Sequence, residues 1–286
     1  MKKIFLFVFA AISISIETNA QVIDGEFNQG EFGFTLGGAH YFGDLNTRSE
    51  LNRPRPSVGL FFRKNFGNYI ALKVAGRFAQ VEYADAISRN NNLYHKTRNL
   101  SFHSNLFEFS VVGDFNFFKY VPGSEYYGFT PYVTLGVGVF SYDPYTFLFN
   151  KTNNTVEKYY LRPLGTEGQA ANNTEYGTMA ICVPFGVGMK YSINKKVNLN
   201  FEISQRFTNT DYLDDVSTSY VKDVATVFPD GPNGPSPAFL LQNRSLVPND
   251  FNTNGRQRGW SKQKDQYVIA EVGVSFNIST YRCPNP

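Results

Sequence analysis

Residues 266–278 read QYVIAEVGVSFNI, and this stretch decides the fold. Apolar side chains occupy every second position, as at Val268 and Val272, and the positions between them carry Glu271 and Ser275. A strand places alternate side chains on opposite faces, so a period of two over more than ten residues predicts a strand with one apolar and one polar face. Helical spacing does not fit this window.

The same alternation recurs along the chain and is separated each time by residues typical of turns. Breaks rich in Gly, Asn, Asp, Ser or Pro end each alternating segment. The sequence therefore predicts eight strands, at residues 30–42, 56–66, 69–83, 105–119, 129–142, 178–192, 197–207 and 266–278.

The connections between these segments alternate in length. Gly67–Asn68, residues 120–128 and Asn194–Lys196 are short, whereas residues 43–55, 84–104, 143–177 and 208–265 are long and polar. An even number of strands with short turns at one end and long loops at the other is typical of bacterial outer-membrane barrels. The sequence predicts an all-β fold: an eight-stranded antiparallel up-and-down transmembrane outer-membrane β-barrel with short periplasmic turns and long extracellular loops.

The N-terminus predicts export. Lys2 and Lys3 precede an apolar stretch, Ile4–Ile16, and small residues follow at Thr18 and Ala20. This order is typical of a secretory signal peptide, here residues 1–20, which would direct a barrel domain of residues 21–286 through a Sec-type route to the cell outer membrane. The stretch is too short to cross a bilayer as a helix.

Composition excludes several classes of protein. The 286 residues carry 27 Lys and Arg against 24 Asp and Glu, a balance that indicates no nucleic-acid partner. Aromatic residues make up 16% of the chain, too many for a disordered protein.

Aromatic residues near segment ends predict two girdles at the membrane interfaces. One would contain Phe66, Tyr69, Tyr120, Tyr126, Tyr127 and Tyr191, and the other Tyr41, Phe42, Tyr83, Tyr142, Phe207 and Tyr267.

Strand parity also predicts what fills the barrel. An eight-stranded barrel is only wide enough for its own side chains, and charges in a dry interior must pair. Five acids and five bases have inward parity, which predicts a salt-bridged plug rather than a conduit. They are Glu31, Arg63, Lys73, Arg77, Glu108, Asp114, Lys190, Glu202, Arg206 and Glu271.

No catalytic, cofactor or metal site is predicted. Ser101 and His103 would share a strand face, but Glu108 has the opposite parity, so a nucleophile, base and orienting acid do not come together. Asp250–Gly255 resembles the first half of a calcium loop, but Ser261 stands where the bidentate acid is required. We therefore expect a protein that is not an enzyme.

The two cysteines are predicted to lie at opposite ends of the barrel. Cys182 has inward parity near the long loops, and Cys283 follows the last strand at the short-turn side. The length of strand between them far exceeds disulfide reach. Cys283 is therefore left either as an unpaired thiol or as one half of an intermolecular disulfide in an oxidising compartment.

Several stretches resemble PorG, the small outer-membrane barrel of the type IX protein secretion and gliding motility machinery. The resemblance is carried by Gly30–Gly33 (GEFG), Gly38–Asn46 (GAHYFGDLN), Pro56–Arg63 (PSVGLFFR), Thr210–Ser217 (TDYLDDVS) and Tyr281–Pro284 (YRCP). These stretches span nearly the whole chain after residue 20, although residues 84–104 and 143–177 contribute no match.

The resemblance implies a non-enzymatic role as an outer-membrane anchor for the periplasmic ring of a PorK-like lipoprotein and its PorN-like partner. In this sequence the partner-binding face would be periplasmic, with Gly67, Asn68, Lys195, Lys196, Arg282 and Cys283 on it. The two lysines would serve equally well as contacts to outer-membrane lipid headgroups. The alternatives are a surface adhesin or receptor that acts through its long loops, and a lipid-A-modifying barrel enzyme, which the parity of Ser101 and His103 disfavours.

Overall fold

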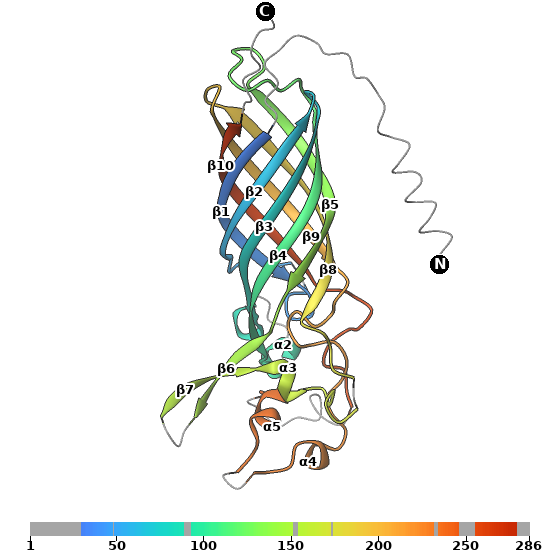
Figure 1. Ribbon diagram of the computed structural model, residues 1–286. Helices are drawn as coiled ribbons and strands as arrows, with labels where there is room; N and C mark the ends of the chain where they lie inside the picture. The colour runs from blue at the N-terminus through green and yellow to red at the C-terminus, as the bar shows by residue number, and fades with distance from the viewer. Residues whose placement is uncertain are drawn as a thin grey trace, which may run out of the picture.

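Eight long antiparallel strands form a closed ring (Figure 1). The computed structural model describes residues 30–47, 49–88, 93–150, 154–172, 174–231, 234–245 and 255–278. The barrel strands are β1 (Gly30–Phe42), β2 (Arg55–Phe66), β3 (Ile70–Ala84), β4 (Ser101–Asn116), β5 (Phe129–Ser141), β8 (Met179–Ser192), β9 (Val197–Thr208) and β10 (Gln266–Ile278).

Every strand of the ring pairs with its neighbours in chain order, and the seam is made by the two ends of the described chain. β1 and β10 pair from Gly30 opposite Ile278 to Phe42 opposite Gln266. The predicted eight-stranded antiparallel up-and-down barrel is therefore confirmed. The largest shift from the predicted bounds is in β4, which begins at Ser101 because residues 101–104 pair with the end of β3.

The outer wall of the barrel is apolar over a height that matches a bilayer. On β4 the outward side chains include Phe107, Phe109 and Phe115, all about half exposed. From Phe107 to Phe117, the residue that follows β4, the extended chain runs about 33 Å at ~3.3 Å per residue, and a tilt of about 40° reduces this to roughly 25 Å along the barrel axis. That height matches the lipid-facing band of membrane barrels. No helix in the described ranges is long and apolar enough to span a membrane.

The long connections contain elements that the sequence did not predict. They gather at one end of the barrel, the long-loop end (Figure 1). A hairpin of β6 (Tyr145–Asn150) and β7 (Thr155–Tyr160) joins the rim of β4. Short helical turns complete these connections: η1 (Asp85–Ile87), α2 (Leu93–Arg98), α3 (Leu161–Leu164), α4 (Val224–Val227) and α5 (Pro237–Gln242).

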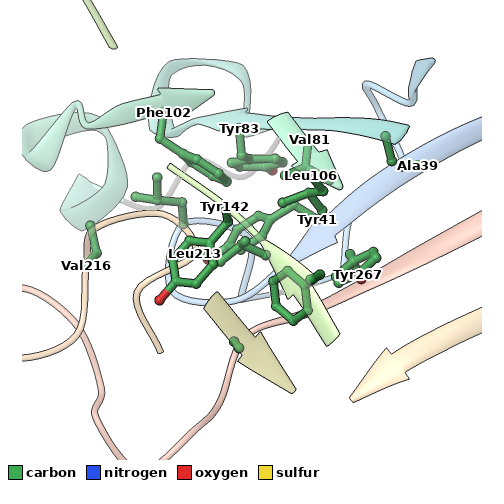
Figure 2. Close-up of a cluster of buried hydrophobic side chains, with 14 of the residues drawn as sticks. Ala39, Tyr41, Val81, Tyr83, Phe102, Leu106, Tyr142, Leu213, Val216 and Tyr267 are labelled. Carbon is green, nitrogen blue, oxygen red and sulfur yellow. The ribbon is translucent and has the colours of Figure 1, made fainter. Parts of the chain in front are cut away.

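The main hydrophobic core lies inside the long-loop half of the barrel and continues into the loops (Figure 2). This corrects the predicted outer girdle at that end, because four of its tyrosines point inward. Strand parity turns Tyr41, Tyr83 and Tyr267 into the lumen, and each is at most 2% exposed. Tyr142 packs with them just beyond β5. At the short-turn end Tyr120 is buried too, whereas the other five aromatics predicted there are exposed.

Candidate functional site

The lumen near the short-turn end is filled by charged side chains around Arg63. Its Nη1 lies 2.9 Å from Glu31 Oε2, and its Nε lies 2.8 Å from Asp114 Oδ2. Lys190 Nζ approaches the same Asp114 oxygen at 3.2 Å. Inward parity on four different strands brings these groups together, and all of them are buried.

The ion pairs continue up the lumen through Glu202. Lys73 pairs with Glu202 and lies 3.8 Å from Asp114. Glu202 also lies 3.8 Å from Arg77 and accepts a hydrogen bond of 2.7 Å from the hydroxyl of Tyr132. The Glu202 carboxylate therefore links the lower group of charges to the upper one.

The upper group of lumen charges centres on Arg77 and Glu108. Arg77 lies 3.2 Å from Glu108 and 3.1 Å from Glu271. Arg206 pairs with Glu108 at 3.1 Å, and Tyr267 donates a hydrogen bond of 2.8 Å to the same carboxylate. These contacts join the charged plug to the hydrophobic core above it.

The structure thus brings all ten sequence-predicted lumen residues into one connected network of ion pairs. The cavity among them has a volume of about 10 Å³, room for about one water at most. Above the network, the buried side chains of the hydrophobic core, among them Tyr41, Phe102 and Tyr267, occupy the lumen. The barrel is closed by its own side chains.

The described parts of the long connections, residues 43–54, 85–100, 142–178 and 209–265, form a folded cap over this core. Arg98 ties three of them together. Its guanidinium pairs with Asp85 at 2.7 and 2.8 Å and donates to the carbonyl oxygens of Asp44 and Arg258, each at 2.9 Å. Since a buried guanidinium needs its donors satisfied, these contacts fix the relative positions of the loops.

A second buried arginine, Arg258, ties the remaining connection to the cap. It pairs with Glu167 at 3.0 Å and donates to the carbonyl oxygen of Asp215 at 2.6 Å. The carboxylate of Glu167 accepts in turn the backbone amides of Ser217 and Thr218 at 2.9 and 3.0 Å. Loop 210–217 is therefore held through both its backbone and its side chains.

The stretches Gly38–Asn46 and Thr210–Ser217 meet in the cap. The hydroxyl of Tyr41 lies 2.5 Å from Asp214 and 3.0 Å from Asp265. A phenol has one hydrogen to donate, so the second contact requires a carboxyl group that is itself protonated. Burial and the neighbouring carboxylate raise the pKa of Asp214 and that of Asp265 well above their ordinary range, which favours this protonation.

Three further carboxyl groups of the cap have raised pKa values. Burial raises the pKa of Asp44 to about 6, although it accepts the Trp260 amide and lies near Arg98. Burial likewise raises the pKa of Asp211 and that of Asp215 to about 6. Within the described part of the chain, no group of three or more Asp, Glu, His or Cys side chains is arranged to hold a metal ion.

The short-turn end carries four of the residues predicted to bind a partner. Gly67, Lys195 and Lys196 are exposed, and Asn68 is half-buried. They belong to two separate turns, and Arg282 and Cys283 lie outside the described residues. Gly67 adopts φ = 79°, the left-handed conformation that glycine accepts without strain.

The connection 117–128 locks these two turns to each other. Tyr120 donates its amide to the carbonyl of Asn68 at 3.3 Å, and Gly123 donates to Ser192 Oγ at 2.8 Å. A Cβ at Gly123 would lie 2.4 Å from Lys195 Cγ, so the connection packs directly on the other turn. The result is one hydrogen-bonded face from which Tyr126, 86% exposed, projects.

The Ser101 and His103 pair is not arranged as a nucleophile and its base. Ser101 Oγ lies 3.1 Å from Thr146 Oγ1 and accepts a hydrogen bond of 2.6 Å from Arg244. His103 does have an acidic partner that sequence parity within one strand missed: Glu82, 2.7 Å away on β3. Among the described contacts no hydrogen bond joins Ser101 to His103.

Sequence reasoning also missed the cap residues Asp85, Arg98, Glu167 and Arg258. They lie in connections without periodicity, and their partners are far away in the chain. The sequence offered one indication of the cap, the two stretches Gly38–Asn46 and Thr210–Ser217, which are neighbours in the structure.

Cys182 lies in the core as its parity predicted, fully buried and without a disulfide.

Fold and lumen together define a transmembrane β-barrel that is closed by its own side chains. A profile of the family described as "Domain of unknown function (DUF6089)" matches residues 2–162, more than half of the chain. The chain belongs to this family. A comparison with curated protein sequences finds no match.

The chain is also similar to several solved barrels. Neisserial surface protein A is 7% identical, with a TM-score of 0.42 over 89% of this chain and 100% of its own. The N-terminal β-barrel domain of Pseudomonas aeruginosa OprF is 12% identical, with a TM-score of 0.34 over 87% and 98%. P. aeruginosa OprG is 10% identical, with a TM-score of 0.37 over 88% and 97%.

Proposed function

We propose that this protein is a non-enzymatic outer-membrane component of a type IX secretion and gliding machinery, and that it anchors a periplasmic ring of PorK-like and PorN-like proteins. The observation that carries the proposal is the closed lumen. A barrel filled by ten paired charges and a hydrophobic core offers no passage for a substrate. Its surfaces, rather than its interior, are then where it acts.

The short-turn face suits a rigid docking surface. Its turns are joined by hydrogen bonds through the connection 117–128, so little conformational entropy would be lost when a partner binds. Tyr126 and the two lysines at 195 and 196 supply an exposed aromatic side chain and positive charge. Aromatic residues dominate the energetics of protein interfaces.

Orientation follows from the general asymmetry of outer-membrane barrels, in which short turns face the periplasm and long loops the exterior. The ring would therefore meet Gly67, Asn68, Lys195 and Lys196, and the cap would face outward. Further support comes from the packing of Tyr41 against Asp214, which places two stretches that carry the PorG resemblance in one folded unit.

A photo-crosslinking experiment tests the proposal. A benzophenone amino acid replaces Tyr126 at the short-turn face, and in a matched control it replaces Trp260, which is 52% exposed in the cap. Irradiation of cells should link the ring lipoprotein or its partner to position 126 and not to position 260. Links to envelope proteins only from position 260 would overturn the anchor and favour a surface receptor.

Two further variants refine this test. Lys195→Glu with Lys196→Glu should weaken co-purification of the ring if the lysines contact protein, and leave it unchanged if they contact lipid headgroups. Cys283→Ser, compared with the parent with and without reductant, tests the intermolecular disulfide. A partner that co-purifies with the unreduced parent, but is lost both from the reduced parent and from Cys283→Ser, would indicate a covalent contact at this tail.

A further inference from the structure

The β6–β7 hairpin leaves the barrel at the rim of β4 and projects sideways instead of continuing along the wall (Figure 1). Tyr145, the first residue of β6, is paired with His103 of β4. The two rings are stacked, with centroids 5.4 Å apart. The base of the hairpin is therefore fixed to the barrel wall.

One face of the hairpin is already occupied by the cap. Thr146 is buried and lies 3.1 Å from Ser101 Oγ. Leu148 and Tyr159, on the same face, pack against the hydrophobic core. This face therefore holds the hairpin in place and is not free for another molecule.

The opposite face, called here the aromatic face, is uncovered. Phe149 is 53% exposed and Val156, its cross-strand partner, 65%. Lys158 lies over the rings of Tyr145 and Tyr160, 3.7 and 4.5 Å from their centroids. The residues of the aromatic face are Tyr145, Phe147, Phe149, Val156, Lys158 and Tyr160.

The aromatic face continues the lipid-facing side of the barrel wall. His103 has outward parity on β4, and the register places Tyr145 on the same side. A polar pair one step nearer the membrane, Gln80 and Asn105 joined at 3.1 Å, ends the outward apolar band at this point. Since the hairpin projects sideways beyond this row (Figure 1), the side of it that continues the lipid-facing wall turns toward the membrane surface.

Charge on the adjoining rim fits an acidic surface. Glu82 is paired with Arg55 at 2.7 Å and with His103 at 2.7 Å, and Arg53 approaches it at 3.5 Å. The side chains of Arg53 and Arg55 remain 56% and 43% exposed. Together with Lys158, these arginines leave the rim and the hairpin with an excess of positive charge.

We propose that the aromatic face is a membrane-surface anchor that lies on the phosphate-bearing headgroup layer of the leaflet at the long-loop end. Tyrosine and phenylalanine rings with a neighbouring lysine are the side chains that favour the bilayer interface. Because the aromatic face continues the lipid-facing wall, the molecule that covers this face is lipid. This inference depends on the barrel crossing a membrane and not on the proposed secretion role.

Tryptophan fluorescence in vesicles tests the anchor. In the full-length protein, Trp260→Phe removes the single native tryptophan. Adding Phe149→Trp then places the only tryptophan on the aromatic face, where its fluorescence reports on the surroundings. The matched control is Thr155→Trp, at the same level of the hairpin but on the face that packs against the cap. Both are reconstituted in phosphatidylcholine vesicles whose lipids are brominated either near the headgroup or deep in the chains.

If the aromatic face is an anchor, tryptophan at position 149 should emit at shorter wavelength and should lose intensity with lipids brominated near the headgroup. Tryptophan at position 155 should show neither effect. Adding phosphatidylglycerol should increase this quenching, and Lys158→Glu should remove the increase. Equal quenching at the two positions would overturn the proposal. A blue shift that grows with protein-to-lipid ratio without lipid quenching would also overturn it, because a second copy would then cover the face. Phe147→Trp is a second reporter if the first variant does not fold.

Discussion

Tyr41, at the end of the first barrel strand, donates its phenolic hydrogen to Asp214, which lies 173 residues later in the chain. The bond is 2.5 Å long and both side chains are buried. It joins the barrel wall to the central loop of the cap, so the two fold as one unit. Cap variants should consequently affect the stability of the long-loop half of the barrel.

Gly43→Ala should disrupt this junction. A Cβ at position 43 would lie 2.0 Å from Asp265 Oδ1 and 2.1 Å from the Tyr41 hydroxyl. Neither group can move without losing its own hydrogen bonds, so we expect a loss of about 1–3 kcal/mol, as for overpacked sites. Amide hydrogen exchange of residues 210–217 in the reconstituted protein measures this loss in the free energy of opening the cap.

Gly76→Ala is the control for that substitution. Nothing lies within 4 Å of a Cβ built at Gly76, which is on the outward side of β3. The exchange of residues 210–217 should therefore match that of the parent. Equal effects of the two alanines would contradict the steric argument.

The cap should open more readily as the pH rises. Folding raises the pKa of Asp44, Asp211 and Asp215 to about 6, from about 3.9 in an open loop. The closed cap therefore binds more protons than the open one, and its stability is greatest below about pH 4 and falls as the pH rises from about 4 through 6. Other charged groups packed around these carboxyls are Arg98, Arg258, Glu167, Lys264, Asp214 and Asp265.

Protection factors for residues 210–217, corrected for intrinsic exchange, measure this opening between pH 4 and 8. We expect a decrease of at least about tenfold, because one unit of pKa displacement corresponds to a factor of ten. Asp214→Asn should reduce the pH dependence, since its amide cannot ionise beside Asp265. Protection that increases with pH would show that the carboxyl groups are stabilised as anions.

Arg63→Met should destabilise the barrel strongly. It removes the partner of Glu31 and one partner of Asp114, both buried. Breaking a buried ion pair on one side costs about 3–5 kcal/mol, which urea unfolding in vesicles measures. Lys64→Met, at the neighbouring outward position, should change stability by less than about 0.5 kcal/mol. Adding Glu31→Gln to Arg63→Met should restore part of the loss.

The barrel should not conduct ions in planar bilayers. The lumen is blocked at two independent levels, by the ion-pair network and by the hydrophobic core. Gly43→Ala, which disturbs only the cap and its junction, should therefore remain closed as well. A steady ohmic current through the parent protein would contradict the closed lumen and, with it, the basis of the anchor proposal.

The barrel could be predicted from the sequence because alternation acts locally. Residues 266–278 and 30–42 were predicted with the bounds that the structure has. Parity alone also placed Glu108 and Arg206 inside, where they are 3.1 Å apart. The same parity turns Tyr41 and Tyr267 into the lumen, so a position near a strand end does not by itself place a tyrosine in a lipid-facing girdle.

The cap could not be predicted, because its contacts link irregular segments far apart in the chain. Arg98 and Arg258 look like solvated loop residues in the sequence, yet each is 2% exposed. The β6–β7 hairpin was missed for a different reason. Its strands are six residues each, too short for alternation to stand out from a polar loop.

The seam between β1 and β10 has a consequence for how the protein is made. Its two strands are the first and last of the ring, with Gly30 opposite Ile278. Six other strands and every long loop must be delivered before the ring can close, and until then both edges expose unpaired amides that favour aggregation. A chain that stops before residue 266 therefore lacks the strand that closes the ring, and we expect quality control to degrade it rather than insert it.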